Sequence, residues 1–174
     1  MSRPKIIVAA LSLSAAGLIG IATHEGYTER AVVPTQGDVP TVGFGSTVRA
    51  DGARVQLADR TSPVQALQTV GAHLGRTEQA FRDSLPGVAM TQASYDLYVD
   101  WTYQFGLANW RGSGMRRELL AGQPRQACEA LLRWRYAGGY DCSTLVGGQP
   151  NKRCWGVWTR QQQRHAACLA ALED

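Results

Sequence analysis

The stretch HEGYTERAVVPTQGDVPTVGFGST, from His24 to Thr47, places an acidic residue, a polar turn and a glycine-rich end within one short segment. β-Branched residues stand on both sides of positions 35–38 and predict two short strands joined by a turn there. The prolines and glycines of the segment argue against a continuous helix. The segment therefore predicts a small β-hairpin lobe with Glu25 at its entrance.

The chain that follows the hairpin has helical spacing. Ser62 is suited to cap a helix whose first residue is Pro63, and apolar residues then recur every three or four positions. Further helices are predicted over 91–104, 113–120, 125–134 and 159–172. The expected fold class is α+β and mainly α, with the β-hairpin lobe ahead of a helical body.

An uncharged run from Ile6 to Thr23 precedes the hairpin and follows the positive charges of Arg3 and Lys5. This is the layout of an export signal or a membrane anchor. As a helix the run would reach about 27 Å, against about 30 Å for a hydrocarbon core, and its many alanines, glycines and serines make it only weakly hydrophobic. We expect an apolar N-terminal helix that spans a membrane marginally. Cleavage after Ala22 is the alternative.

The cysteines indicate an oxidising compartment such as the periplasm, because an even number of them follows an export-type N-terminus. Four cysteines allow three pairings. Cys142–Cys154 with Cys128–Cys168 is favoured, because the glycine- and proline-rich loop between 142 and 154 can close locally. A zinc site is less favoured, since close cysteine pairs are absent. No metal and no cofactor are expected.

The charge balance favours an anionic partner. The chain has 18 basic and 14 acidic residues in 174, a formal net charge of +4. The arginines are scattered instead of forming a basic stripe interleaved with aromatic residues, so nucleic acid is not the expected partner. A chain of this length can bury one sizeable hydrophobic core, and we expect a monomer.

Glu25 is a candidate general acid. In glycoside hydrolysis one carboxylic acid protonates the leaving oxygen, while a group across the sugar ring activates water or offsets positive charge. A glutamate at the end of an apolar helix, followed by a polar turn and a strand, is suited to the first role. Taken alone, such a residue is more often a solvated helix end.

Several motifs resemble those of the phage-type lysozymes, glycoside hydrolase family 24. Glu25-Gly26-Tyr27 is similar to the family's Glu-Gly-aromatic element, and PTVGFGST at 40–47 to its Pro-Thr-Ile-Gly-Tyr-Gly-His-Thr. The similarity continues through LLAG at 119–122, WRYAGG at 134–139 and GVWTRQ at 156–161. The resemblance implies a lysozyme-like fold. It also implies an endolysin that cleaves the β-1,4 bond between N-acetylmuramic acid and N-acetylglucosamine in peptidoglycan, lysing the host.

The resemblance assigns catalytic roles to Glu25 and Thr41, but Thr41 follows Glu25 by 16 positions, where the family has 15. No carboxylate stands at the family's second catalytic position. Either the longer turn brings Asp38 into the site or Thr35 fills the position. Asp38 is favoured, since a carboxylate can both activate water and offset oxocarbenium charge. Ser46 replaces the usual histidine.

Gln104 is a candidate substrate contact. It lies in DWTYQFG at 100–106, where the family often has Phe-Asn-x-Gly, so its amide is suited to an N-acetyl sugar. The neighbouring aromatic residues are explained equally well by core packing. A noncatalytic exported module that binds peptidoglycan is the alternative function.

The N-terminal run resembles the signal-anchor-release segment of a subset of endolysins. This implies that residues 1–23 form the anchor, with residues 6–23 in the host inner membrane, and that residues 24–174 form the catalytic domain at the periplasmic face. While the segment is in the bilayer, the cleft cannot assemble around Glu25. Release into the periplasm would then activate the enzyme.

Overall fold

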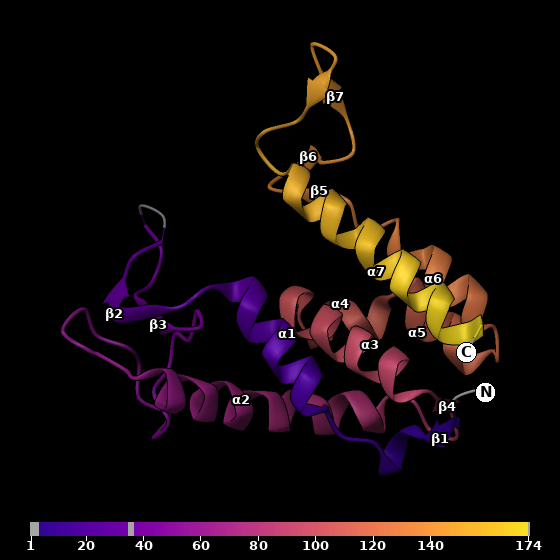
Figure 1. Cartoon of the computed structure of the whole chain (residues 1–174), viewed down its shortest axis with the longest axis horizontal. Coiled ribbons are helices and arrows are strands. Elements are labelled where there is room, and N and C mark those ends of the chain that lie inside the picture. The colour runs from indigo at the N-terminus through magenta and orange to yellow at the C-terminus, as the bar shows by residue number, and fades with distance from the viewer. Residues whose placement is uncertain (1–3, 35–36, 174) are drawn as a thin grey trace. The chain divides into compact units, whose positions relative to one another are not determined.

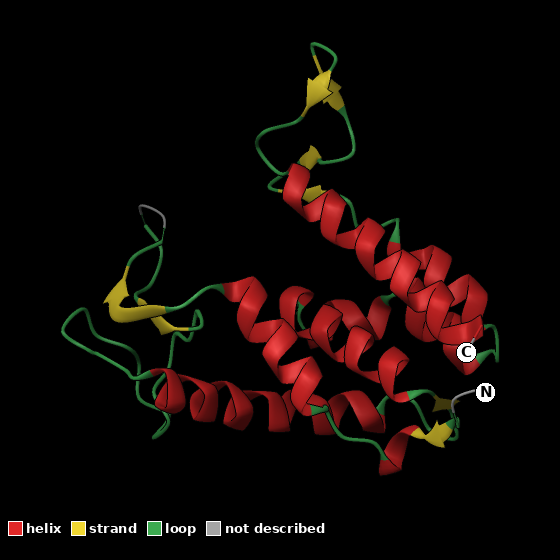
Figure 2. Cartoon of the chain, viewed as in Figure 1, coloured by secondary structure: helices red, strands yellow, loops and turns green. Residues whose placement is uncertain are grey.

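The structure, a computed structural model, describes residues 4–34 and 37–173. The chain divides into two compact units. One runs from Leu13 to Ala80, and the other combines the N-terminal residues up to Ser12 with residues from Phe81 onward. Helices dominate, and the strands form four separate two-stranded pairs within the described residues (Figures 1 and 2).

The Leu13–Ala80 unit contains the predicted hairpin. Strand β2 (Thr28–Val32) pairs antiparallel with β3 (Thr41–Gly43), and Ala31 and Val42 of these strands form a small buried apolar cluster with Val55. Helix α1 (Ala15–Glu25) precedes the hairpin, and α2 (Pro63–Asp83) follows it and continues into the second unit. The hairpin lobe expected from the sequence is confirmed.

Helix α2 begins where the sequence predicts. The Ser62 hydroxyl accepts a hydrogen bond from the Gln65 backbone nitrogen at 3.3 Å, and the Gln65 side-chain oxygen accepts one from the Ser62 backbone nitrogen at 3.0 Å. This reciprocal capping box satisfies two backbone donors that the first turn leaves without partners. Pro63 then costs nothing, because its position needs no amide hydrogen.

The second unit is a helical body built around aromatic residues. Its helices are α3 (Gln92–Phe105), α4 (Leu107–Gly112), α5 (Gly114–Leu120), α6 (Pro124–Leu131) and α7 (Trp155–Glu173). Trp110 is fully buried against Phe81 and Tyr98, and its indole nitrogen donates to the Ser84 hydroxyl at 2.8 Å. Burial of such large rings supplies much of the driving force for folding.

The helices differ from the sequence expectation in three places, one of which is the end of α6 at Leu131, three residues before the predicted end at 134. Helix α4 was not predicted, since it has six residues and no side-chain cap at Gly106. Helix α7 begins at Trp155, four residues before the predicted start, because the Asn151 carbonyl accepts from the Trp155 nitrogen at 2.9 Å. Periodicity does not detect these features.

The expected apolar helix over residues 6–23 is absent, which corrects the prediction. The run is divided into strand β1 (Ile6–Ile7), the 3₁₀ helix η1 (Val8–Ala10), an extended link and most of α1. Ser14 causes the division, because its hydroxyl accepts from the Gly17 nitrogen at 3.0 Å and starts α1 at Ala15. Among the described residues, no helix is both long enough and apolar enough to cross a membrane.

Strand β1 pairs antiparallel with β4 (Ala89–Met90). The residues that follow β1 are held in the second unit by specific contacts. The Arg82 guanidinium donates to the Leu11 carbonyl at 3.2 Å and the Gln92 amide donates to the Ser12 carbonyl at 2.8 Å. Residues 6–12 of the run therefore supply a strand and the buried side chains of Val8 and Leu11 to the second unit.

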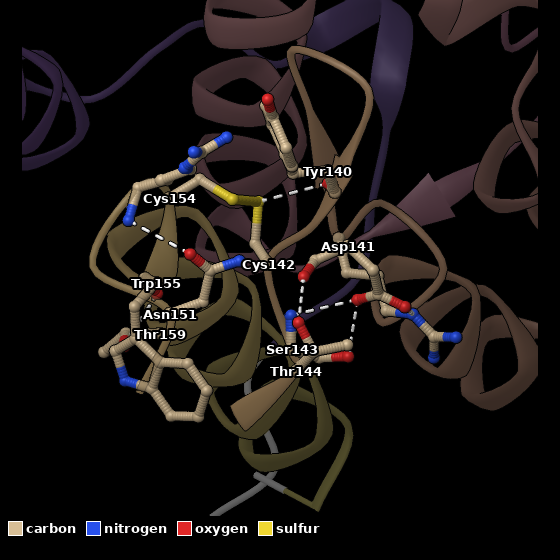
Figure 3. The surroundings of a disulfide bond; sticks show 11 residues. Tyr140, Asp141, Cys142, Ser143, Thr144, Asn151, Cys154, Trp155 and Thr159 are labelled. Atoms are coloured by element: carbon tan, nitrogen blue, oxygen red, sulfur yellow. Dashed lines mark hydrogen bonds and ion pairs between the residues drawn. A yellow bond between two sulfur atoms is a disulfide. The ribbon is translucent and has the colours of Figure 1, made fainter. Parts of the chain in front are cut away.

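The structure has the two disulfides that the sequence favours, Cys128–Cys168 and Cys142–Cys154. The first joins α6 to α7 across a sequence separation of 40, and the second closes a loop of 12. In the chain-entropy model, closures of these lengths contribute about 4 and about 3 kcal/mol. Figure 3 shows the second bridge beside the Asp141 carboxylate, which accepts two hydrogen bonds from Ser143.

Candidate active site

Glu25 is the last residue of α1 and is exposed within its unit. Gly26 follows it with a φ of +71°, a left-handed conformation in which glycine has no steric penalty. The chain therefore turns sharply after Glu25 and enters β2 at Thr28. The end of a helix and the start of a strand fix the backbone on both sides of the carboxyl group.

A glycine-rich turn lies next to the Glu25 carboxylate. Val42 and Ser46 exchange two backbone hydrogen bonds, of 3.0 and 3.1 Å, and so close a three-residue turn over Gly43, Phe44 and Gly45. A Cβ atom built on Gly45 would lie 3.7 Å from Glu25 Oε2. The fold thus brings together the two motifs that carry the resemblance in the sequence.

Aromatic packing supports the same arrangement. The rings of Tyr27 and Phe44 have centroids 5.5 Å apart, and the Tyr27 hydroxyl donates to the Thr61 carbonyl at 2.7 Å. These contacts join the residue before β2, the glycine-rich turn and the segment that leads into α2. They hold the turn beside Glu25 independently of any substrate.

Position 43 requires glycine for two reasons: its backbone is in the left-handed conformation, and there is no room for a side chain. Its φ is +68°, and an added Cβ would lie 2.7 Å from the Ala66 Cβ in α2. We expect Gly43→Ala to lower the free energy of unfolding by about 1–3 kcal/mol, because it combines a strained backbone with overpacking. Urea denaturation measures this change.

Gly52→Ala is the matched control, because Gly52 also has a positive φ, +85°, but no heavy atom within 4 Å of the added Cβ. It should carry only the conformational penalty. Equal losses in the two variants would contradict the close approach of the turn to α2.

Thr41 is the first residue of β3 and is half-buried. It lies opposite Val32 in the hairpin, and its hydroxyl donates to the Val32 carbonyl across 3.4 Å. This is a long hydrogen bond, so little free energy is needed to redirect the hydroxyl toward another acceptor. Thr41 therefore belongs to the same hairpin as the glycine-rich turn beside Glu25.

Asp38 is exposed in the link between β2 and β3, three residues before Thr41. Thr35, the alternative candidate, lies outside the described residues. The choice between Asp38 and Thr35 therefore stays a prediction.

Gln104 lies in the second unit, in the last turn of α3, within a charged network. Its side-chain oxygen accepts from Arg164 Nη1 at 2.6 Å. Arg164 Nε also donates to Asp100 Oδ2 at 2.8 Å, and Arg160 donates to Asp100 Oδ1 at 2.7 Å. The network fixes the amide plane, with its oxygen directed to Arg164.

Sequence reasoning did not identify Asp100, Arg160 and Arg164 as partners of this amide. The signal was the spacing of Arg160, within the GVWTRQ motif, and Arg164 by about one helical turn, which puts both on the same face of α7. Their acceptors lie some 60 positions earlier in the chain, a separation that spacing alone does not bridge.

Ser46 is 5% exposed, and its hydroxyl has no hydrogen-bond partner among the described residues. It stands where the resemblance expects a histidine. A serine is too short to make the contacts of an imidazole, so an unpaired buried hydroxyl is a direct consequence of the substitution. It does not contribute to the turn beyond its backbone hydrogen bonds.

Comparison with known proteins agrees with these features. A family model described as phage lysozyme matches residues 22–153. The endolysin of Salmonella phage P22 is 27% identical over 128 residues, covering 74% of this chain and 86% of that protein. A SAR-endolysin of bacteriophage PS119 is 33% identical over 61 residues, covering 35% of this chain and 36% of that protein.

Among solved structures, the endolysin from Escherichia coli O157:H7 phage FAHEc1 has a TM-score of 0.76 at 25% identity, covering 92% of this chain and 94% of that one. The fold, the geometry of the motifs and the family match all indicate the same class of protein. The chain belongs to the phage lysozyme family. It is a glycoside hydrolase with a lysozyme-like α+β fold that is mainly helical.

Proposed function

We propose that this lysozyme acts as an endolysin, with Glu25 as the general acid that cleaves the β-1,4 bond between N-acetylmuramic acid and N-acetylglucosamine in peptidoglycan. The observation that carries the assignment is the position of the Glu25 carboxylate beside the Gly43–Gly45 turn. The protonated carboxyl gives its proton to the glycosidic oxygen as the bond to the anomeric carbon breaks. Positive charge then develops on the sugar ring.

Asp38 and Thr41 act on the other reactant, water. The Asp38 carboxylate takes a proton from the attacking water and offsets the oxocarbenium charge, while the Thr41 hydroxyl orients that water. The 3.4 Å length of the hydrogen bond from Thr41 to the Val32 carbonyl supports this role, because so weak a bond is easily exchanged for one to water. Gln104 contributes a contact to an N-acetyl group, with its orientation supported by the hydrogen bond from Arg164.

A noncatalytic peptidoglycan-binding module is not favoured, because the family match and the relatives are lysozymes and endolysins. Purified, fluorescently labelled sacculi separate the two functions. An enzyme releases soluble muropeptides over time in proportion to its concentration. A binding module sediments with the sacculi and releases none, and that result would overturn the assignment.

The enzyme is also a signal-anchor-release endolysin, with residues 1–23 as the anchor and residues 24–174 as the catalytic domain. It waits at the periplasmic face of the host inner membrane and is then released into the periplasm. Similarity to the PS119 SAR-endolysin supports this, as does the weak hydrophobicity of the run from Ile6 to Thr23. The divided, packed form of that run is the released state, and the membrane form is a continuous helix.

Replacing Gly17 and Gly20 with leucine tests the anchor. Two leucines add enough buried apolar area to hold the helix in the bilayer. We expect the variant to remain in the membrane fraction and to fail to lyse cells. At Gly20 the folded state has no heavy atom within 4 Å of an added Cβ.

Leucine at Gly71 and Gly75 is the matched control, because these helical glycines also have no heavy atom within 4 Å of an added Cβ. That variant should lyse cells at the wild-type rate. The mass of the periplasmic protein supplies a second measurement. A mature, fully active protein that begins at Thr23 would contradict the proposal.

A further inference from the structure

One surface feature contains none of the residues assigned to the proposed catalytic site. We call it the stapled arm and define it as residues 135–154. It contains two hairpins, β5 (Tyr136–Ala137) with β6 (Tyr140–Asp141), and β7 (Leu145–Val146) with β8 (Gln149–Pro150). Figure 1 shows β7 beyond the N-terminal end of α7. The Cys142–Cys154 bridge closes the base of the outer hairpin.

The tip of the stapled arm is apolar and exposed. Leu145 is 60% and Val146 is 65% exposed, and the glycines that follow, Gly147 and Gly148, both have positive φ and form a tight turn. Aliphatic side chains at the tip of a hairpin gain no burial within the fold. Their exposure is explained if another apolar phase covers them.

Aromatic and basic side chains surround this tip. Tyr136 and Tyr140 are both exposed, and the Arg153 guanidinium lies 4.5 Å from the Tyr140 ring centroid. Lys152 is exposed next to Arg153. The arm therefore has an apolar tip, then tyrosines, with cations beside them.

The charge of the arm is positive. It carries Arg135, Lys152 and Arg153 against the single acid Asp141, so its net charge is 3 − 1 = +2, half of the chain's +4. Asp141 is engaged by Arg135 at 3.1 Å. The hydrogen bonds from the Ser143 hydroxyl and backbone nitrogen, together with the positive charge of Arg135, hold the pKa of Asp141 below its ordinary value, so this acid remains ionised and paired. Lys152 and Arg153 are thus the cations that can face an anionic partner.

We propose that the stapled arm is a membrane-docking element that inserts the Leu145–Val146 tip into the headgroup region of an anionic phospholipid bilayer. Aliphatic tips enter the acyl boundary, tyrosine rings lie at the interface, and lysine and arginine bind lipid phosphates. A sugar polymer is less suited, because sugar sites are concave and hydrogen-bonding, and the arm presents a convex aliphatic tip. The arm is distinct from the proposed anchor.

Cosedimentation of the full chain with vesicles tests the proposal. The variant Leu145→Ser with Val146→Ser is compared with Leu57→Ser with Val64→Ser, whose side chains are 64% and 65% exposed in the other unit. Vesicles contain phosphatidylethanolamine with phosphatidylglycerol, or phosphatidylcholine alone. We expect the tip variant to lose at least about tenfold in partition to the anionic vesicles, and the control to match wild type.

A second pair tests the charges. The double variant Lys152→Gln with Arg153→Gln should bind the anionic vesicles more weakly than wild type, and its binding should depend less steeply on salt. The control, Arg111→Gln with Arg125→Gln, loses the same number of charges outside the arm. It should bind these vesicles more strongly than the Lys152→Gln, Arg153→Gln variant does. Residues 6–23 are identical in every variant, so any membrane binding through them adds the same background to each, and the fold-changes are taken after that background is subtracted.

Hydrolysis of lipid-free peptidoglycan should be the same in the tip variant, its control and wild type, so failure of the docking proposal and failure of the lysozyme assignment are distinguishable. Wild-type vesicle binding by the tip variant would overturn the proposal. So would loss of binding to lipid-free sacculi with unchanged vesicle binding, because the arm would then be a contact for the wall polymer.

Discussion

Glu25→Gln is expected to reduce peptidoglycan hydrolysis by about 10³-fold or more while leaving the fold intact. Glutamine has nearly the shape of glutamic acid but no proton to give to the leaving oxygen, and a positioned general acid contributes about 10²–10⁴ in rate. The measurement is the rate at which reducing ends appear in purified peptidoglycan. Circular dichroism checks the fold.

Glu29→Gln is the matched control. Glu29 lies four residues further along, on β2, and its exposed carboxylate forms an ion pair of 3.5 Å with Arg60. Exposed pairs of this kind contribute at most about 1 kcal/mol, so this variant should hydrolyse peptidoglycan at close to the wild-type rate. Full activity in Glu25→Gln would remove Glu25 from the mechanism.

Asp38→Asn is the second change with a large expected effect, a loss on the order of 10² in rate, the scale of a lost general base. The amide can neither take a proton from water nor offset the oxocarbenium charge. Thr35→Ala should cost much less. The same reducing-end assay, at saturating substrate, measures both.

Asp51→Asn controls for the loss of an exposed aspartate in a loop. Asp51 accepts a hydrogen bond from the Ala53 nitrogen at 2.9 Å, which an asparagine oxygen can also accept. The Asp51→Asn variant should hydrolyse peptidoglycan at the wild-type rate. If Thr35→Ala proves the more damaging of the two hairpin variants, the second catalytic role belongs to Thr35 and the extra residue lies elsewhere in the hairpin.

The local features of this fold could be predicted from the sequence because each is determined by residues that are close together in the chain. Ser62 and Pro63 predict the start of α2, and the structure has a reciprocal hydrogen-bonded cap there. Gly43 and Gly45 mark a turn, and both have positive φ. The two disulfides followed from an even cysteine count and a loop able to close.

The structure of the N-terminal run, residues 6–23, could not be predicted in the same way. Val8, Leu11 and Ile21 are apolar, and the same side chains suit a bilayer or a protein core. The choice depends on partners distant in sequence, such as β4 and the side chains of Arg82 and Gln92. Hydropathy measures only the run itself, so it predicted a continuous helix.

The candidate site shows the same limit. Glu25 and the glycine-rich turn were identified from motifs and are neighbours in the fold. The network around Gln104 could not be derived, because Asp100 and Arg164 come from different helices. The second catalytic group depends on the path of the longer turn, which no local rule determines.

The central claim is that Glu25 acts as the acid of a muramidase. Its most direct test is the identity of the reducing ends that the wild-type protein produces from purified peptidoglycan, determined by borohydride reduction and mass spectrometry. Hydrolysis of the proposed bond leaves N-acetylmuramic acid as the new reducing sugar, and Glu25→Gln should produce almost none of it. Reducing ends on N-acetylglucosamine, or an anhydro sugar formed without water, would contradict the account.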